Sequence, residues 1–330
     1  MFRAVSVGWK KYWWGNGVVP DRTNRIEDIY LRFYNGKTWE EYVDVPLEQA
    51  ERIMDSKGFE KNNRTVLYMH GFIETAQQES IQVMVSAYLE TRPDTNIILI
   101  DWSNMAHGSY LVNAARNTKK VGAAAAAQVN RLIEAGLSMD RLHLIGHSLG
   151  SHVAGYLARE LKNKYGKTVK RVTALDPAFP AFYPDGIVME HISDKDAEFV
   201  DVIHTDSGVY GAPVRTGSVD FWPNGGKGIQ PGCPRFAPVP LSEDNLCSHW
   251  RSWRFYAESV RNPEAFPASP ADSYHKFREN PSPEVGMVYM GVNCDTSARG
   301  SFYLTTNSQS PFGKGMDGIH HKKNSKNKKR

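Results

Sequence analysis

The chain has 330 residues, of which 41% are hydrophobic and 23% are charged. This composition supports a sizeable core and excludes a wholly disordered or collagen-like chain. The net charge is only +4, and six of the last nine residues are Lys or Arg, so the remainder is slightly acidic. We therefore expect no nucleic-acid partner for the body of the protein.

Residues 1–28 are rich in Trp, Gly and charge, which predicts an irregular N-terminal segment. Over residues 29–313, short apolar runs alternate with stretches of helical spacing. The runs predicted as strands are Ile29–Phe33, Thr65–Met69, Asn96–Asp101, Arg141–Ile145, Val169–Leu175, Phe199–His204, Met287–Met290 and Ser301–Thr306. Helices are predicted over Gln77–Leu89, Tyr110–Ala135, Ser151–Lys164 and Ser248–Val260. This alternation predicts an α/β fold with a mostly parallel sheet and helices on both faces.

Two other regions show no periodicity. Asp206–Cys247 is rich in Gly and Pro and is predicted as loop. Residues 314–330 form a basic tail that is predicted to be disordered. A solvated end is the simplest interpretation of this tail, although its charge could attract an anionic surface or a glycan.

No apolar run approaches the length of a membrane-spanning helix. The N-terminus lacks the uninterrupted apolar stretch of a secretory signal, so none is predicted for the chain as it stands. The three cysteines lack the CxxC spacing of zinc sites. The spacing of Cys233 and Cys247 suits a disulfide-closed loop, which leaves Cys294 unpaired.

The segment Gly146-His147-Ser148-Leu149-Gly150 has the G-x-S-x-G pattern. It follows one predicted strand and precedes a predicted helix, which is the context of a nucleophile elbow. The two glycines relieve the steric clashes of such a strained turn. A small-residue turn that only packs a helix on a strand is the alternative, but the context favours a nucleophilic Ser148.

A nucleophilic serine needs a base, and the base needs an orienting carboxylate. In an α/β-hydrolase the acid follows the serine in the chain and lies at the end of a later strand. Asp176 ends the run Val169–Leu175 and is the first candidate, although a turn carboxylate before Pro is common in general. Asp206, after the next predicted strand, is the runner-up, whereas Asp201 lies inside that strand.

Three histidines follow the candidate acid. His204 lies within a predicted strand and fits a structural role, and His275 has no supporting context. His249 lies two residues after Cys247, where a helix is predicted to begin. A loop that is cross-linked at this point could carry the imidazole to the nucleophile, so His249 is the favoured base.

An oxyanion hole needs two backbone N–H donors. Leu149, directly after the nucleophile, supplies one candidate. The segment His70-Gly71-Phe72 follows the strand Thr65–Met69, so the N–H of Phe72 is the second candidate. An ordinary strand-exit turn is the alternative for this segment.

Together these segments resemble the pancreatic lipase family, the neutral lipases and phospholipases A1 of animals. The matching segments, in the family's order, are Met69–Phe72, Ile100–Trp102, Gly146–His152, Leu175–Pro177, Phe199–Asp206, Asp220–Gly226, Pro231–Cys233 and Cys247–His249. The resemblance implies Ser148 as nucleophile, Asp176 as acid and His249 as base. It also implies an oxyanion hole formed by Phe72 and Leu149. The implied reaction is hydrolysis of an acyl ester through an acyl-enzyme, with no organic cofactor.

Within this family, substrate choice tracks two surface loops, which here are the lid Pro234–Leu246 and the segment Ser207–Val219. Both are short, as in the phospholipase A1 branch that includes the insect enzymes. The resemblance therefore implies a phospholipase A1 that acts on glycerolipids at a lipid–water interface, with triacylglycerol lipase or galactolipase as alternatives. Phe236, Val239 and Leu241 could contact lipid there, or they could pack inward.

Family members are secreted, so the resemblance implies an extracellular protein, although no signal is visible. Some members bind calcium just before the strand that here begins at Phe199. Ser193 and Asp196 match that pattern, while His191 stands where Arg is usual. Such oxygen ligands could hold a structural Ca²⁺, but a solvated acidic turn is favoured. Insect yolk proteins resemble the family and serve as storage or binding proteins without the catalytic serine, whereas Ser148 is present here.

Overall fold

The computed structural model describes residues 25–184, 188–280 and 283–320. Most of the predicted N-terminal segment 1–28 and of the predicted tail 314–330 therefore lies outside the described residues. The strands are β1 (Tyr30–Tyr34), β2 (Tyr42–Pro46), β3 (Arg64–Met69), β4 (Thr95–Asp101), β5 (Leu142–His147), β6 (Arg171–Leu175), β7 (Phe199–Ile203), β8 (Val219–Pro223), β9 (Pro267–Pro270), β10 (Val288–Tyr289) and β11 (Gly300–Leu304). The α-helices are α2 (Glu79–Thr91), α3 (Ala115–Glu134), α4 (Leu149–Tyr165), α5 (Glu243–Arg261) and α6 (Tyr274–Glu279). Short turns of other helix types are η2 (Ile26–Asp28), η3 (Leu47–Asp55), η4 (Tyr110–Ala114), η5 (Met139–Arg141) and η6 (Gly315–Gly318).

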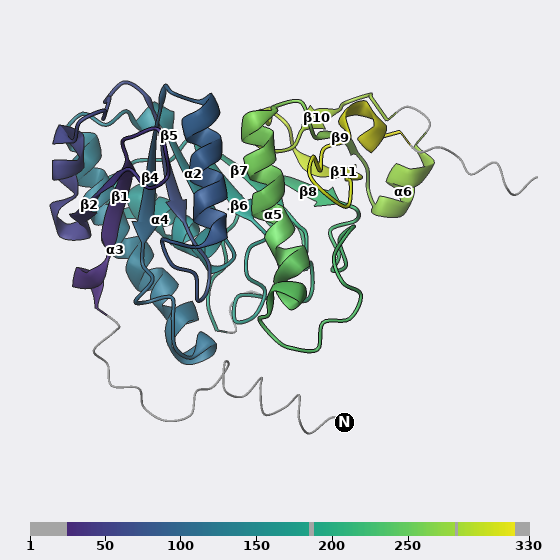
Figure 1. Ribbon diagram of the computed structural model, residues 1–330, viewed down its shortest axis with the longest axis horizontal. Helices are drawn as coiled ribbons and strands as arrows, with labels where there is room; N and C mark the ends of the chain where they lie inside the picture. Colours follow the sequence, from purple (N-terminus) through teal and green to yellow (C-terminus); the bar gives the residue numbers. More distant parts are fainter. Residues whose placement is uncertain (1–24, 185–187, 281–282, 321–330) are drawn as a thin grey trace, which may run out of the picture.

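The strands form an 11-stranded sheet in the order β10-β9-β11-β8-β7-β6-β5-β3-β4-β1-β2. The strands from β11 to β4 in this order pair in parallel, and the strands at both edges pair antiparallel. Figure 1 shows α2 and α5 in front of the sheet, with α3 and α4 behind it. The predicted α/β class, with helices on both faces of a mostly parallel sheet, is confirmed. Within the described ranges, no helix combines the length and the apolar character that crossing a bilayer requires.

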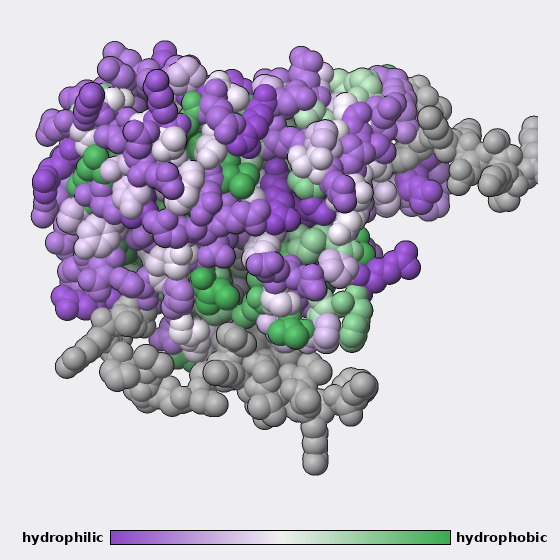
Figure 2. Space-filling view, in the orientation of Figure 1, coloured by the Kyte–Doolittle hydropathy of each residue, from purple (hydrophilic) through white to green (hydrophobic). Residues whose placement is uncertain are grey.

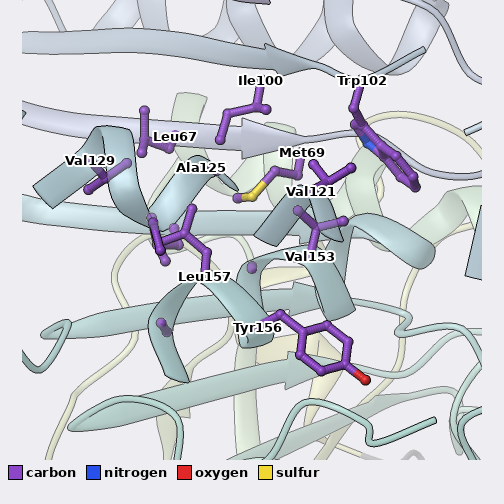
Figure 3. Packing of buried hydrophobic residues seen from close by; sticks show 14 of the residues in the cluster. Leu67, Met69, Ile100, Trp102, Val121, Ala125, Val129, Val153, Tyr156 and Leu157 are labelled. Carbon is purple, nitrogen blue, oxygen red and sulfur yellow. The ribbon is translucent and has the colours of Figure 1, made fainter. Parts of the chain in front are cut away.

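The central strands are buried on both faces, which is why they read as continuous apolar runs in the sequence. On one face, Leu67 belongs to a cluster with Val121 of α3 and Val153 of α4 (Figure 3). On the other face, Tyr68 belongs to a cluster with Val85 of α2. This packing brings the carboxyl ends of the parallel strands to one edge, where functional groups of α/β sheets gather.

Strand β8 lies inside the region Asp206–Cys247 that the sequence predicts as loop. All five of its residues are buried, and it pairs in parallel with both β7 and β11. The prediction of an unbroken loop is therefore wrong. The strand is short and ends on Pro223 in a Gly-rich setting, and these features usually mark a break in a strand.

The chain after residue 313 is partly folded, in contrast to the predicted disordered tail. Residues 315–318 form η6, and the backbone N–H of Thr305 donates to the carbonyl of Gly318 at 2.8 Å. Ile319 is fully buried, in a cluster with Trp222. The predicted boundary after residue 313 is therefore too early, because two apolar residues, Met316 and Ile319, are too few to leave a periodic pattern.

Candidate active site

Ser148 lies at the sharp turn between β5 and α4, with φ 54° and ψ −119°. A non-glycine residue rarely adopts a positive φ, so the surrounding packing must hold it there. A Cβ atom at Gly146 would lie 2.2 Å from the carbonyl oxygen of Gly150, and one at Gly150 would lie 2.1 Å from that of Met69. The turn therefore requires both glycines, as the sequence pattern predicts.

The backbone of Ser148 is tied to the segment that carries the candidate acid. Its N–H donates to the carbonyl of Leu175 at 3.0 Å, and its carbonyl accepts from the N–H of Ala178 at 3.2 Å. Leu175 and Ala178 flank Asp176 in the chain. The candidate nucleophile and the candidate acid therefore share one hydrogen-bonded scaffold.

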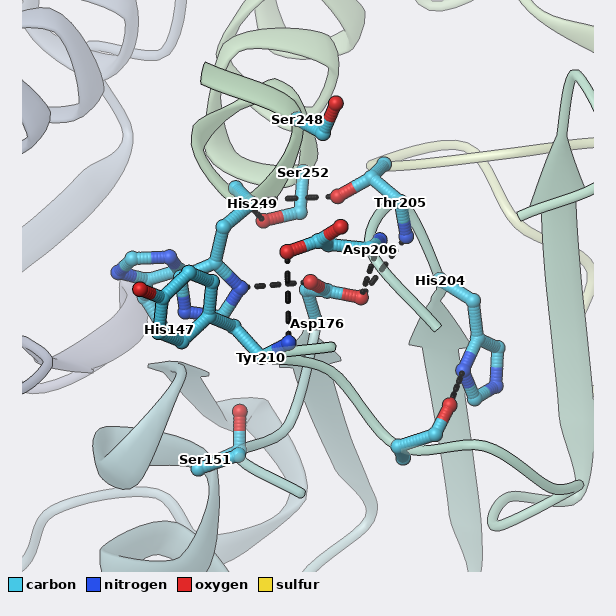
Figure 4. Close-up of polar contacts among 12 residues, drawn as sticks. His147, Ser151, Asp176, His204, Thr205, Asp206, Tyr210, Ser248, His249 and Ser252 are labelled. Carbon is cyan, nitrogen blue, oxygen red and sulfur yellow. Dashed lines mark hydrogen bonds and ion pairs between the residues drawn. The ribbon is translucent and has the colours of Figure 1, made fainter. Parts of the chain in front are cut away.

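Asp176 follows β6, is fully buried and has a φ of 47°. Its Oδ1 accepts backbone N–H groups of Thr205 at 2.8 Å and Asp206 at 3.1 Å. Its Oδ2 lies 2.6 Å from Nδ1 of His249, which donates to it (Figure 4). This contact fixes the orientation of the imidazole and leaves Nε2 as the ring nitrogen that can take a proton.

His249 lies within α5, which begins at Glu243 rather than at the predicted Ser248. The side chain of Ser242 caps the helix by accepting the N–H of Asn245 at 3.3 Å. The candidate base is therefore carried by a packed helix and not by the loop end that the sequence suggests. A Ser followed by acidic residues is a helix-start signal that could have placed this boundary.

The predicted disulfide between Cys233 and Cys247 is present, with Cα atoms 5.7 Å apart. Cys247 lies on α5, two residues before His249, so the disulfide joins the preceding loop to the helix that carries the candidate base. Cys294 is a free thiol, as predicted, and it is buried. Burial raises the pKa of the Cys294 thiol well above its usual range, which disfavours the reactive thiolate.

The candidate oxyanion donors lie beside the elbow. Leu149 is the first residue of α4, so its N–H has no acceptor within the helix. The N–H of Phe72 donates to no residue that the structure describes. A Cβ added at Gly71, the residue before Phe72, would lie 3.0 Å from Cβ of Ser148. The loop that carries Phe72 therefore approaches the elbow closely.

Ser148 and His249 line the same cavity, which has a volume of about 220 Å³. Its walls are largely apolar and include Phe72, Tyr110, Leu241, Leu246 and Trp250. Ligand sites of this kind combine apolar walls with a few placed polar groups. The arrangement suits an apolar chain with a reactive carbonyl held next to the serine.

The other two candidate histidines have partners elsewhere. Nε2 of His204 lies 2.8 Å from Oδ1 of Asp220, and the His204 ring stacks on Trp222 with centroids 3.8 Å apart. Figure 4 shows His204 well apart from His249. His275 is exposed on α6, where it faces Glu279 at 3.4 Å. The sequence interpretation of His204 as a structural residue agrees with these contacts.

The two alternative carboxylates differ in their surroundings. Asp201 lies in β7 and forms a buried ion pair with Arg171 at 2.8 Å. Asp206 lies beside Asp176, and its Oδ2 accepts the N–H of Tyr210 at 3.3 Å. Burial, and then the negative charge of Asp176, raises the pKa of Asp206 to about 7. Asp206 therefore carries a proton under mildly acidic conditions.

This protonation predicts a pH dependence of stability. The pKa of Asp206 is higher in the folded state than in the unfolded state, so its stabilising contribution is lost as the pH rises from about 4 to about 7. Asp206→Asn mimics the neutral carboxyl at every pH. We expect it to raise the unfolding midpoint at pH 8, with a gain that shrinks towards pH 4, measured by thermal unfolding across that range. The exposed Asp194→Asn is the control, and an equal response from both variants would contradict the prediction.

Gly211 packs directly against the candidate acid. A Cβ at this position would lie 2.2 Å from Oδ1 of Asp176 and 2.5 Å from its Oδ2. We expect Gly211→Ala to displace the carboxylate and to lower kcat/KM on a soluble ester by about 100-fold, since small displacements of catalytic groups are this damaging. Gly208→Ala is the matched control. The backbone φ of Gly208 is 83°, which strains an alanine, but a Cβ added there meets nothing within 4 Å. Equal activity in the two variants would show that the contact with Asp176 has no such role.

The three predicted lid residues differ in exposure. Phe236 is 81% exposed and Val239 is 61% exposed, whereas Leu241 is half-buried and lines the cavity. Figure 2 shows hydrophobic side chains gathered around the lower end of α5, where the loop that precedes the helix lies. Phe236 and Val239 are thus available to an external apolar surface, and their contact with lipid stays a prediction.

The residues proposed for calcium do not fit a cation. Both carboxylate oxygens of Asp196 accept hydrogen bonds from the guanidinium of Arg159, at 2.8 and 2.9 Å. The N–H of Ser193 donates to the same carboxylate, and the carbonyl of His191 also accepts from Arg159. Across the described ranges, no group of three or more His, Cys, Asp or Glu side chains could hold a metal ion. A cationic guanidinium thus takes the place that Ca²⁺ would need.

Sequence reasoning assigned no role to two polar residues of the cavity, Glu74 and His147. Nδ1 of His147 lies 3.2 Å from Oε2 of Glu74. The sequence places both residues next to candidate site segments, because His147 directly precedes Ser148 and Glu74 follows Phe72 by two residues. The pattern alone could not reveal their mutual contact, which joins segments from two different strands.

Comparison with known proteins places the chain among lipases. A sequence model of the family described as Lipase matches residues 15–312. The chain is 35% identical to mouse (Mus musculus) pancreatic lipase-related protein 2, over 87% of this chain and 63% of the relative. It is 31% identical to pig (Sus scrofa) pancreatic triacylglycerol lipase, over 87% of this chain and 68% of the relative. It is also 31% identical to human (Homo sapiens) inactive pancreatic lipase-related protein 1, over 92% of this chain and 68% of the relative.

Among solved structures, the α/β hydrolase MGS-M1 from a Medee basin deep-sea metagenome library overlaps with 56% of this chain and 67% of its own. That overlap has 16% identity and a TM-score of 0.34. The chain spans 63% of the length of the mouse relative. The family match over most of the chain confirms the resemblance, and this protein therefore belongs to the Lipase family, as a relative of the pancreatic lipases with an α/β-hydrolase fold.

Proposed function

We propose that the chain is a lipid acyl-ester hydrolase, and specifically a phospholipase A1 that releases fatty acid from glycerophospholipids. One observation carries the proposal of hydrolysis: His249 donates to Asp176 at 2.6 Å in the cavity wall that Ser148 also forms. Family membership supports this proposal, since the pig relative is named a triacylglycerol lipase. The inactive human relative makes a direct activity test necessary.

In the proposed reaction, Oγ of Ser148 attacks the ester carbonyl while Nε2 of His249 takes its proton. Asp176 holds the imidazole and stabilises the imidazolium that forms. The N–H groups of Phe72 and Leu149 bind the oxyanion of the tetrahedral intermediate. The imidazolium then protonates the departing alcohol oxygen, which leaves an acyl-enzyme. Water, activated by the same imidazole, releases the fatty acid and restores the serine.

The preference for phospholipid rests on the two surface loops near the cavity. The lid is closed by a disulfide between residues only 14 positions apart. Such a short lid leaves room for a polar headgroup at the cavity mouth. The exposed Phe236 and Val239 supply apolar area for contact with a lipid surface. A triacylglycerol lipase is the second candidate, which the name of the pig relative favours.

An extracellular location is part of the proposal. The disulfide between Cys233 and Cys247 supports it, because such bonds persist in oxidising compartments. The proposed partner is a lipid–water interface. Attraction of the basic tail to an anionic surface or glycan concerns its Lys and Arg residues at 322–330, which lie outside the described ranges.

The test is a side-by-side assay on phosphatidylcholine, a galactolipid and a triglyceride, with the position of the released fatty acid determined. Release from the sn-1 position of phosphatidylcholine, faster than from the other two lipids, is the expected result. Preference for triglyceride or galactolipid would replace the phospholipase assignment. Labelling with a fluorophosphonate distinguishes a storage protein, since an enzyme should be modified at Ser148.

A further inference from the structure

Glu74 connects the two halves of the candidate oxyanion hole. Its carboxylate is buried, and its Oε2 accepts the N–H of Gly71 at 2.5 Å. The same oxygen lies 3.2 Å from Nδ1 of His147, which donates to it. Its Oε1 accepts the hydroxyl of Ser80 at 2.8 Å. One carboxylate thus binds both the loop that precedes Phe72 and the elbow.

His147 brings this contact close to the candidate base. Its ring lies 4.8 Å from the ring of His249, measured between centroids, and Figure 4 shows the two rings side by side. Nε2 of His147 is buried and has no hydrogen-bond partner among the described residues. The contact with Glu74 is therefore the polar contact that orients this ring.

The charge of Glu74 is maintained by its partners. Burial alone would raise the pKa of this carboxyl, but the charge and hydrogen bond of His147, with a contribution from His70, lower it to about 2. A buried carboxylate is stable only when it is paired and hydrogen-bonded. The carboxylate therefore stays charged over the ordinary pH range and can accept hydrogen bonds from Gly71, His147 and Ser80.

We propose that Glu74 is a positioning residue that sets the separation of the two oxyanion donors, with His147 as its link to the nucleophile elbow. The inference rests on the proposed ester hydrolysis and extends it. Gly71 directly precedes Phe72, and His147 is two residues before Leu149. A carboxylate that binds both segments therefore fixes the distance between the N–H groups of Phe72 and Leu149.

The experiment compares Glu74→Gln with Glu79→Gln on a soluble ester and on its thionoester analogue. Glu79 is exposed on α2 and pairs with Arg254 at 3.0 Å, so it controls for loss of a carboxylate nearby. A well-aligned oxyanion hole favours oxygen over the larger and weaker acceptor sulfur. We expect Glu74→Gln to lower kcat on the oxoester by about tenfold or more, with little change in KM. The rate ratio of oxoester to thionoester should fall by about the same factor.

A second variant, His147→Phe, keeps a ring but removes the donor to Glu74. If both side chains act through one contact, the double variant should lose little more kcat than Glu74→Gln alone. Equal slowing of oxoester and thionoester, or additive losses, would show a general structural role and overturn the inference. If the wild-type chain neither hydrolyses esters nor reacts with a fluorophosphonate, the proposed function is overturned together with this inference. If the wild type is active but Glu74→Gln leaves the oxoester-to-thionoester rate ratio unchanged, only this inference is overturned.

Discussion

Replacing Ser148 with alanine should reduce ester hydrolysis by roughly 10⁵-fold or more, because no other group can form the acyl-enzyme. The fold should persist, since the backbone N–H and carbonyl that tie residue 148 to Leu175 and Ala178 remain. The measurement is kcat/KM on a soluble ester, with circular dichroism to verify folding. Fluorophosphonate labelling should disappear in the same variant.

Ser151→Ala is the matched control for this change. The hydroxyl of Ser151 donates to the carbonyl of Gly146 at 2.8 Å, and Figure 4 shows Ser151 well separated from His249. This variant should keep most of the activity and all of the labelling. Activity that survives Ser148→Ala, or that is lost only with Ser151, would remove Ser148 as the nucleophile.

Replacing Asp176 with asparagine should lower kcat by roughly 10⁴-fold, because the imidazole would be held in the wrong tautomer. The N–H groups of Thr205 and Asp206 would still bind the amide oxygen. The amide nitrogen would then face Nδ1 of His249, which must become an acceptor, so Nε2 would carry the proton. Such an imidazole cannot accept the proton of Ser148, although the site geometry is retained.

Asp206→Asn provides the comparison for this second change. Asp206 is the alternative acid from the sequence, yet its carboxylate makes no hydrogen bond to His249 among the described contacts. We therefore expect Asp206→Asn to keep kcat within about tenfold of the wild type. Steady-state kinetics on one soluble ester measures both variants, and a larger loss in Asp206→Asn would reverse the assignment of the acid.

The strands that form the centre of the sheet were predictable because burial on both faces makes their sequences apolar throughout. The runs Thr65–Met69 and Asn96–Asp101 fall on β3 and β4 within a residue. Strand β2, which lies at the edge of the sheet, has only one fully buried residue and left no such run. Burial on both faces therefore reveals a strand only where its residues are apolar throughout; β8 is fully buried but contains Asp220 and Pro223, and it left no such run.

The candidate site residues that could be predicted are those whose neighbours in the sequence mark their structural position. Ser148 and Asp176 both follow buried strands, and glycines around Ser148 mark the turn. The link from Glu74 to His147 joins residues 73 positions apart, and no local pattern reports such a contact. The guanidinium of Arg159 on α4 likewise reaches Asp196 in the loop before β7, and the local calcium pattern could not reveal this contact.

Hydrogen bonds tie the backbone of Ser148 to the residues on both sides of Asp176, so substitutions in this part of the molecule would displace both side chains. The loop before α5 is not part of this hydrogen-bonded scaffold. The candidate nucleophile and acid lie on β5, β6 and their connections, and the candidate base lies on α5, whereas the loop before α5 contributes Leu241 to the cavity wall and is joined to α5 by the disulfide. If the proposed hydrolysis holds, we expect replacements in that loop between Cys233 and Cys247 to change substrate preference more than the rate of the chemical step. We expect a chimaera with a longer lid to keep Ser148, Asp176 and His249 in their present arrangement. Exchange of this loop could then change the range of substrates without changes elsewhere in the chain.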